Sequence, residues 1–220
     1  MIKEVKTCEL FESIPSILKP YFDETTYPWE ILPKIKEIVA NFLQNGIEGY
    51  HLLKEGILVG EGVTIAETAT IIPPAIIGNK VEIRPGAYLR GNVIISDRCV
   101  IGNSSELKNS ILFEHVQVPH YNYVGDSVLG NNSHMGAGSI CSNLKSDGKN
   151  IVIHGEEDIE TGLRKIGGIL GDYADIGCGS VLNPGTVVGQ HTQFYPLTMG
   201  RGVYPRNCIV KSTKEYVMKK

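Results

Sequence analysis

One aliphatic side chain returns every six residues over most of this chain of 220 residues. The unbroken part of this column consists of Val59, Ile65, Ile71, Ile77, Ile83, Leu89, Ile95, Ile101 and Leu107. Steps of five lead to Leu112 and Leu129, and after an interruption the column resumes from Leu170 to Phe194. Because an α-helix has 3.6 residues per turn, it cannot keep residues six apart on one face, so helix is excluded here.

A hexapeptide period with one inward aliphatic residue per unit is typical of a parallel β-helix, in which each short strand forms one wall of a stacked coil. Each strand then pairs with the equivalent strand one rung away. This pairing satisfies the backbone hydrogen bonds and excludes water from the aliphatic column. We therefore predict a mainly β fold, with a β-helix domain over residues 57–210. The pattern alone does not define the handedness of the coil.

Residues 1–56 precede the repeat, and we predict that they form a small helical cap. Stretches at about 9–18 and 31–44 have helical spacing of their apolar residues. The ends of a solenoid expose apolar surface, so this segment is expected to cover the first coil. Its single tryptophan, Trp29, is expected to pack.

Two further segments leave the period. Residues 144–165 are rich in charge and are predicted to form an extruded loop, because a long excursion from a regular scaffold is often functional. The alternation at Ile151–Ile153 indicates a short hairpin inside it. Residues 211–220 carry four lysines and are either a solvated C-terminal tail or an arm that contributes to an anionic cofactor site.

Composition excludes several classes of partner. A net charge of −3 gives no basic field for nucleic acid or an anionic membrane surface, and no stretch reaches the ~20 apolar residues of a membrane span. The five cysteines are scattered and lack CxxC spacing, which favours reduced thiols over disulfides or structural zinc. We predict a cytoplasmic protein that binds neither nucleic acid nor membrane and, because its histidines are dispersed, no metal.

The residues best suited to chemistry lie between 119 and 143. This stretch holds two histidines, two tyrosines, an acid and a Gly-Ala-Gly turn. Because it lies within the repeat, the scaffold would hold these side chains rigidly. A catalytic site on a stiff coil is the first expectation.

Four motifs follow one another with characteristic spacing: Arg84-Pro-Gly-Ala, then GNSSELKNS from Gly102, HYNYVGD from His120, and MGAGSICSN from Met135. Together they resemble the acetyltransferase domain of the bifunctional glucosamine-1-phosphate acetyltransferase/N-acetylglucosamine-1-phosphate uridylyltransferase. The loop and GLRKIGGILGD from Gly162 are closer to archaeal-type bifunctional sugar-1-phosphate nucleotidylyltransferases that acetylate amino-sugar phosphates.

This resemblance covers about residues 57–205 and implies a left-handed β-helix that forms a homotrimer, with ligands between neighbouring coils. It implies an acetyl-CoA-dependent N-acetyltransferase acting on glucosamine-1-phosphate or galactosamine-1-phosphate in nucleotide-sugar and cell-wall precursor synthesis. The 56 residues before the repeat leave no room for the Gly-rich nucleotidylyltransferase domain of the bifunctional relatives, so nucleotidyl transfer is not expected.

In the family, the histidine that matches His120 is the general base, which accepts a proton from the sugar amine as the amine attacks the thioester. An imidazole with an ordinary pKa near ~6.5 suits that work near neutrality. His134 stands where the family usually has asparagine. It either contacts the sugar or replaces a lost hydrogen bond.

Arg84 and Lys108 match residues that bind the anionic part of the substrate, and a guanidinium with an ammonium makes a sensible phosphate clamp. The alternative for both is a solvated charge at a corner of the coil. Tyr123 and Asn143 match positions that contact the sugar.

The loop and the later coils supply the remaining candidates. Arg164 and Lys165 match an Arg-Lys pair of the archaeal-type group and are candidates for phosphate contact. The resemblance also implies a cofactor groove for acetyl-CoA along Gly136, Ala137, Gly138, Cys178 and Pro196. No base partner is evident for Cys178, so it is expected to pack or to make a weak contact, not to act as a nucleophile.

Two alternatives remain open. The first is an acyltransferase of the same fold that acts on another amino or hydroxyl sugar, nucleotide-linked or not. The second is a non-catalytic trimeric module that binds a sugar phosphate or nucleotide sugar, or partners a separate nucleotidylyltransferase. Thiol release from acetyl-CoA separates the enzymes from the binding module.

Overall fold

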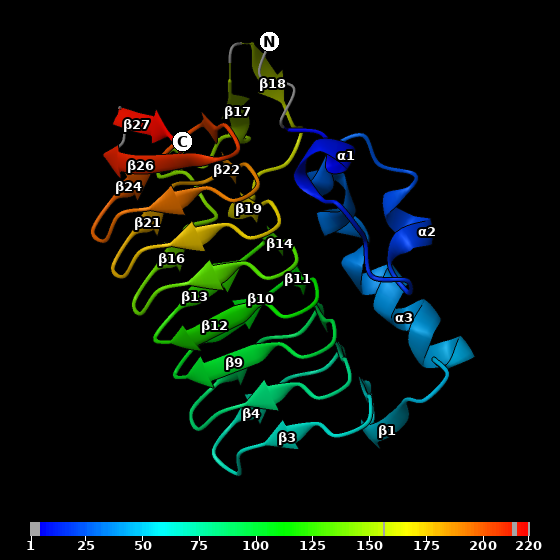
Figure 1. The fold of residues 1–220 in the computed structure, drawn as a ribbon. Helices are drawn as coiled ribbons and strands as arrows, with labels where there is room; N and C mark the ends of the chain where they lie inside the picture. The colour runs from blue at the N-terminus through cyan, green and yellow to red at the C-terminus, as the bar shows by residue number, and fades with distance from the viewer. Residues whose placement is uncertain (1–4, 156, 213–214, 220) are drawn as a thin grey trace.

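Three parallel β-sheets wrap around a common axis and form the walls of a solenoid (Figure 1). The computed structural model describes residues 5–155, 157–212 and 215–219. The solenoid is a left-handed parallel β-helix, as expected from the resemblance. Four residues within the expected cap, Met1 to Glu4, one of the expected loop, Glu156, and three of the expected tail, Thr213, Lys214 and Lys220, lie outside the described residues.

The chain visits the three sheets in turn, and each sheet is named here by a letter. Sheet A contains β1 (His51–Lys54), β2 (Ile57–Val59), β5 (Ala75–Ile77), β8 (Val93–Ile95), β11 (Ser110–Leu112), β14 (Val128–Leu129), β19 (Gly168–Leu170), β22 (Thr186–Val188) and β25 (Val203–Tyr204). Sheet B contains β3 (Thr64–Ile65), β6 (Glu82–Ile83), β9 (Val100–Asn103), β12 (Gln117–His120), β15 (His134–Met135), β20 (Asp175–Ile176), β23 (Gln193–Phe194), β26 (Cys208–Ser212) and β27 (Glu215–Met218). Sheet C contains β4 (Thr70–Ile71), β7 (Tyr88–Leu89), β10 (Glu106–Lys108), β13 (Tyr123–Gly125), β16 (Ile140–Cys141), β21 (Val181–Leu182) and β24 (Met199–Gly200).

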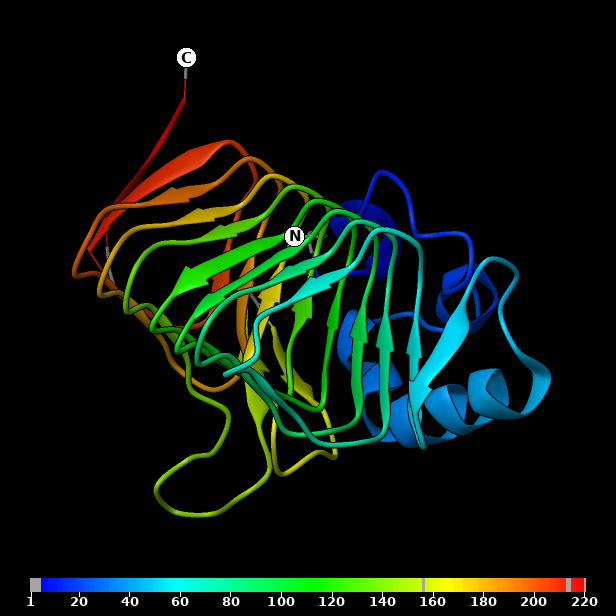
Figure 2. The ribbon, with the colours of Figure 1, turned by 90° about the horizontal axis from the view of Figure 1, so that it is seen from below.

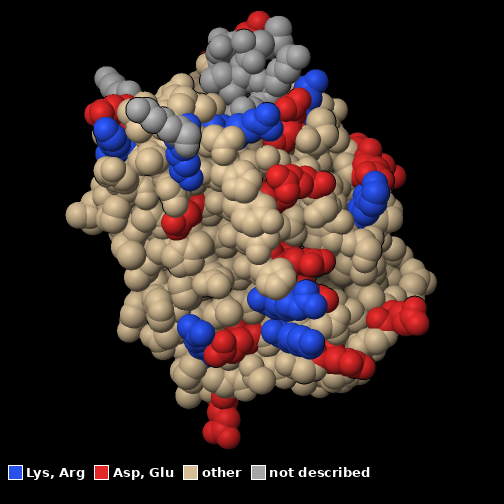
Figure 3. Space-filling model, in the orientation of Figure 1, with Lys and Arg blue, Asp and Glu red and all other residues tan. Residues whose placement is uncertain are grey.

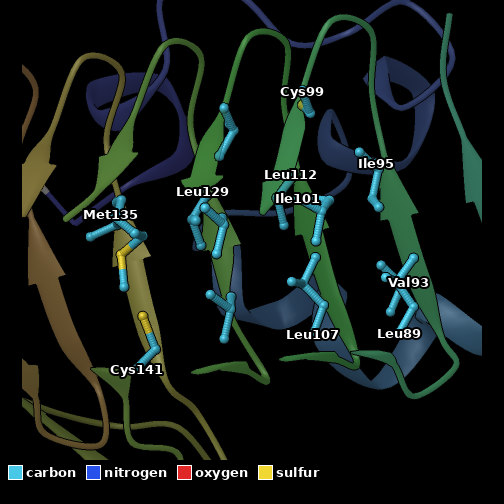
Figure 4. Close-up of a cluster of buried hydrophobic side chains, with 14 of the residues drawn as sticks. Leu89, Val93, Ile95, Cys99, Ile101, Leu107, Leu112, Leu129, Met135 and Cys141 are labelled. Atoms are coloured by element: carbon cyan, nitrogen blue, oxygen red, sulfur yellow. The ribbon is translucent and has the colours of Figure 1, made fainter. Parts of the chain in front are cut away.

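The six-residue column forms the interior of the coil, as predicted (Figure 4). Its members are buried, except that Ile65, in one of the first coils, is only partly buried. The steps of five have a simple cause in the register. Ile76 pairs with Ile94 eighteen residues on, whereas Ile94 pairs with Ile111 and Ile111 with Val128, each seventeen residues on. A coil with a five-residue step is therefore one residue shorter, and the strands still stack.

The N-terminal segment lies along the outside of sheet A, contrary to the expectation that it covers the first coil (Figure 2). It contains α1 (Thr7–Leu10), α2 (Lys19–Phe22), the 3₁₀ helix η1 (Pro28–Lys34) and α3 (Ile35–Asn45). The outward side chains of sheet A, such as Ile76, Ile94 and Ile111, are apolar and share a buried cluster with the helices. Covering this wall removes these apolar side chains from water, which favours the placement.

The helices themselves agree in part with the sequence. The expected helix at 31–44 is present as η1 followed by α3, and Gly46 ends it with φ 76°. The expected helix at 9–18 is reduced to the single turn of α1, which ends at Leu10, and Phe11 is already extended. A helix continuing to residue 18 would also have included Pro15, which lacks a backbone N–H. Trp29 packs as expected: it is 2% exposed and stacks on Tyr27 with ring centroids 4.6 Å apart.

Antiparallel strands pair with the terminal strands of two sheets. β1 pairs with β2 at the beginning of sheet A, and β27 pairs with β26 at the end of sheet B. Part of the expected tail from residue 211 is thus a strand.

The charged excursion after β16 is an extruded loop, and it carries the expected hairpin. Its strands are β17 (Val152–His154) and β18 (Asp158–Glu160), which pair antiparallel. Ile151 and Ile153 are buried in the same cluster as the helices, so the hairpin covers sheet A beyond the helical segment. Across the described ranges, no helix is long and apolar enough to cross a bilayer.

Candidate active site

The turns that lead from sheet B to sheet C, here called the BC corner, form one hydrogen-bonded row. The N–H of Gly138 donates to the His120 carbonyl at 2.9 Å, and the N–H of Gly179 donates to the Ala137 carbonyl at 2.8 Å. On the next rung, the N–H of Leu197 donates to the carbonyl of Cys178 at 2.8 Å. This register places four of the predicted site residues on successive rungs, namely His120, Ala137, Cys178 and Pro196.

Glycines at two positions, required for different reasons, leave the backbone of the BC corner uncovered by side chains. A Cβ added to Gly136 would lie 2.6 Å from the backbone N of Cys178, so the close approach of the next rung requires glycine there. Gly138 has φ 70° and nothing within 4 Å of an added Cβ, so there the backbone conformation favours glycine and the space outside is open. The corner therefore presents accessible backbone to a ligand.

A buried amide holds the turn that carries His120. The N–H of His120 donates to Asn122 Oδ1 at 3.0 Å, and Asn122 Nδ2 donates to the carbonyl of Gly136 at 2.8 Å. Asn122 is 3% exposed. The His120 side chain is exposed, and within the described ranges its imidazole has no hydrogen-bond partner. Both ring nitrogens are thus free to meet a substrate on a rigid support.

A second group lies where sheet C leads back to sheet A, here called the CA corner, and Asp126 is its centre. The Asp126 side chain is 7% exposed and accepts from Lys108 Nζ at 3.0 Å and from Asn109 Nδ2 at 2.9 Å. Asn143 Nδ2 donates to the same carboxylate. Asp126 has φ 48°, a conformation that aspartate and asparagine tolerate better than most residues. Asp126 thus fixes two of the predicted substrate-binding residues, Lys108 and Asn143.

Tyr123 joins the two corners across the outer face of sheet C. A Cβ added to Gly125 would lie 2.4 Å from the Tyr123 hydroxyl, so the ring runs over Gly125 toward the CA corner. Burial raises the pKa of Tyr123, and the charges of Asp126 and Glu106 raise it further, while a hydrogen bond from Asn143 opposes the shift. The phenol therefore keeps its proton at neutral pH and can donate it to a ligand.

Arg84 lies apart from Lys108 within one chain. It follows β6 on the outer face of sheet B, where its Nε and Nη2 donate to the Glu82 carboxylate at 3.0 and 3.1 Å. It belongs to the BC corner, two rungs or about 10 Å along the axis from the His120 turn. Lys108 ends a strand of sheet C at the CA corner. A single chain thus does not form the clamp from Arg84 and Lys108 that the sequence suggested.

His134 forms a pair that sequence reasoning missed. Its Nδ1 lies 2.9 Å from Asp175 Oδ1 on the outer face of sheet B, and both side chains are about half exposed. The hydrogen bond from His134 lowers the pKa of Asp175, and the charges of His134 and Lys219 lower it further. The partners are 41 residues apart because the extruded loop separates their rungs. Resuming the six-residue register after the loop would have aligned them.

Arg164 and Lys165 end the extruded loop beside the Asp126 group. Leu144 and Lys165 form an isolated β-bridge, and the N–H of Ile166 donates to the carbonyl of Asn143 at 3.1 Å. Both basic side chains are exposed. The structure thus brings them to the CA corner with Lys108, Tyr123 and Asn143, and leaves His120 and the predicted cofactor residues on the BC corner.

Charge is mixed on the face of the molecule that carries the front strands of Figure 1. Figure 3 shows lysine and arginine interspersed with aspartate and glutamate, without one large field of either sign. On this face, an anionic ligand must therefore be held by individual side chains.

The family of the chain follows from a match to the model of the GMPPB C-terminal domain over residues 71–215, more than half of the chain. The chain belongs to this family. The coil, corners and extruded loop described above are thus those of a member of this family.

Curated relatives agree with the relationship predicted from the motifs. A bifunctional protein GlmU of Methanococcus maripaludis (strain C5) is 30% identical over 202 residues, which cover 90% of this chain and 46% of the relative. A bifunctional sugar-1-phosphate nucleotidylyltransferase/acetyltransferase of Sulfurisphaera tokodaii is 32% identical over 181 residues, which cover 80% of this chain and 45% of the relative. The chain spans less than half the length of these relatives. Among solved structures, a hexapeptide transferase family protein from Anaplasma phagocytophilum is 18% identical with a TM-score of 0.41, and the match covers 76% of this chain and 82% of that one.

Proposed function

We propose that this protein transfers the acetyl group of acetyl-CoA to the amine of an amino-sugar-1-phosphate, either glucosamine-1-phosphate or galactosamine-1-phosphate. The observation that carries the proposal is the row along the BC corner, where the His120 turn is followed by Ala137, Cys178 and Pro196 on successive rungs. A row of small residues beside an unpaired imidazole suits a long thioester arm that ends at a base. The acetyltransferase named in the Sulfurisphaera tokodaii relative supports the same reaction class.

In this reaction the amine nitrogen forms a bond to the thioester carbon, the carbon–sulfur bond breaks, and the thiolate of CoA leaves. His120 accepts the proton that the attacking amine loses and can pass a proton to the thiolate. The oxyanion would be stabilised by a backbone N–H of the corner other than those of Gly138, Gly179 and Leu197, which already donate within the row. Holding the amine and the thioester together lowers the entropic part of the barrier.

The acceptor is held by the Asp126 group. Lys108 provides positive charge for the phosphate, and Asp126 fixes its ammonium at 3.0 Å so that little side-chain freedom is lost on binding. Tyr123 and Asn143 offer a hydroxyl and an amide to the sugar. Because Arg84 and Lys108 lie apart within one chain, Arg84 of a neighbouring copy would add a guanidinium suited to a phosphate.

We further propose a homotrimer in which the BC corner of one copy faces sheet C of the next. His120 ends β12 before sheet C begins, whereas Lys108 ends β10 after sheet C has been crossed, so the two groups are separated within one chain. Tyr121 and Leu197, next to His120 and Pro196 on the corner, are 66% and 84% exposed. Exposed apolar side chains beside a site favour an interface there.

The first experiment measures thiol release from acetyl-CoA with each sugar phosphate. His120→Ala is expected to lower the rate about 10²–10⁴-fold, as for loss of a general base. His51→Ala, an exposed histidine on β1, is the control and should leave the rate unchanged. No turnover by the native chain with any amino sugar would overturn the proposal, and turnover only with hydroxyl sugars would replace the acceptor class.

The second experiment mixes two inactive variants, His120→Ala and Lys108→Ala. If each site takes His120 from one copy and Lys108 from its neighbour, random mixed trimers should recover about one intact site in four. Mixtures that stay as inactive as the separate variants would show that both residues act from one copy.

A further inference from the structure

A hollow lies beside the CA corner, between the extruded loop and the later rungs of sheet C. It has a volume of about 410 Å³, within the usual range of small-molecule sites. Its floor is Ser142, Asn183 and Arg201, the residues that follow equivalent positions of β16, β21 and β24. Successive rungs are about 4.8 Å apart, so this polar floor is about 10 Å long.

Three basic side chains, Lys145, His154 and Arg201, line this hollow together with one carboxylate, Asp147. Lys145 lies 3.6 Å from Asp147, and His154 lies 3.0 Å from Asp158, so two of the three have acidic neighbours. Within the described residues no carboxylate lies within ion-pair distance of Arg201. The floor thus offers one uncompensated guanidinium, which is the group best suited to bidentate contact with phosphate.

The hairpin fixes the far wall of the hollow against the coil. A Cβ added to Gly202 would lie 2.8 Å from the carbonyl oxygen of His154, so this strand rests directly on the turn that carries Arg201. Leu144, Val152 and Pro184 add apolar surface to the lining. The hollow thus combines a cationic floor with apolar walls on a rigid support.

We propose that this hollow binds a nucleoside diphosphate group, with the diphosphate on Arg201 and Lys145 and the nucleoside against Leu144, Val152 and Pro184. A bare phosphate would leave most of the 410 Å³ and the apolar lining unused. Binding here does not depend on acyl transfer at His120. Two compounds carry the required chemistry: a nucleotide-linked sugar, and CoA with its own adenosine diphosphate.

The test is titration calorimetry on the full chain with GDP, UDP, CoA and inorganic pyrophosphate as separate probes. Arg201→Ala should weaken binding of the nucleotide probe about 10- to 100-fold, the loss expected for a charged hydrogen bond. Arg98→Ala, an exposed arginine in a turn between sheets A and B, is the matched control and should not change it. His120→Ala should also bind normally, so a failure of the proposed acetyl transfer is distinguishable from a failure here.

Competition identifies the source of the group. If GDP or UDP displaces CoA and Arg201→Ala weakens both, the hollow holds the nucleotide end of CoA. If GDP or UDP binds without displacing CoA, the hollow holds a nucleotide-linked ligand. Equal affinity for pyrophosphate and the nucleotides would overturn the nucleoside part of the proposal, and no binding, or binding insensitive to Arg201→Ala, would overturn it entirely.

Discussion

Sheets A and C are walls of the same coil, yet the outer face of sheet A is covered by other segments and that of sheet C is open. From β2 to β22, the outward residues of sheet A are apolar and at most 7% exposed, namely Leu58, Ile76, Ile94, Ile111, Val128, Ile169 and Val187. The outward residues of sheet C include Tyr88, Glu106 and Tyr123, and no described helix covers them (Figure 2). Both sheets contribute aliphatic side chains to the inward column, so the two walls differ in their outward residues. These outward residues determine whether a wall packs against other segments or stays open to ligands.

This division explains why the candidate site lies where it does. The helices and the hairpin cover the outer face of sheet A from β2 to β22, so a ligand can reach sheets B and C and the corners at either end of sheet C. His120 and Tyr123 both lie on that accessible side. Substituting an outward residue of sheet A is therefore expected to affect folding. Substituting an outward residue of sheet C is expected to affect ligand binding.

The largest expected effect tests the covered wall. Phe113 is fully buried, and its ring centroid lies 4.7 Å from that of Phe11 and 5.2 Å from that of Phe22. Phe113→Ala should cost about 3–5 kcal/mol of the free energy of unfolding, because it leaves a cavity between coil and helices. Tyr88→Ala, on the open wall at 38% exposure, should cost less than about 1 kcal/mol. Urea titration of both variants measures the contrast, and equal losses would contradict the division into a structural and a free wall.

The inward face of the coil could be predicted from sequence, and the outer faces could not. The six-residue column identified Ile77, Leu89 and Leu107 as core, because one buried position per unit is a strictly periodic signal. The outward residues of sheet A recur only once per coil, about every 18 residues, and their period is hidden among the other outward positions. The helices were consequently assigned to the end of the coil and not to its side.

The candidate site was predicted residue by residue, but not its division between corners. Motif resemblance picked out Lys108 and His120, which the fold places at opposite ends of sheet C. Spacing along the chain does not reveal this, because the chain changes direction at each corner and residues close in sequence can lie on different walls. Asp175 was missed because the extruded loop interrupts the register between it and His134.

A smaller effect is expected when either of two buried aspartates at corners of the coil is replaced. Asp172 is 1% exposed and accepts from the N–H of Glu12 at 2.8 Å and from the N–H of Asn131 at 2.7 Å, so it ties the covering segment to the coil. Asp172→Ala should cost about 2–3 kcal/mol of stability, because buried donors lose their acceptor, and should leave KM for the sugar phosphate unchanged. Asp126→Ala should also lose stability but in addition raise that KM about tenfold, because Lys108 is no longer held. A raised KM in the Asp172 variant, or an unchanged one in the Asp126 variant, would contradict this assignment.

The smallest effect concerns sheet B, an open wall whose polar groups pair with one another. His134 lowers the pKa of Asp175, so the folded-state pKa lies below the unfolded value of about 3.9. The stability that this shift contributes is therefore present above about pH 3.9 and is lost as pH falls through the folded-state pKa. His134→Ala should be slightly less stable than the native chain at pH 6, and urea titrations at decreasing pH should show that difference shrinking below pH 4. A difference that grows in acid would mean that His134 stabilises the fold through some group other than Asp175, and sheet B would then resemble the covered wall more than the free one.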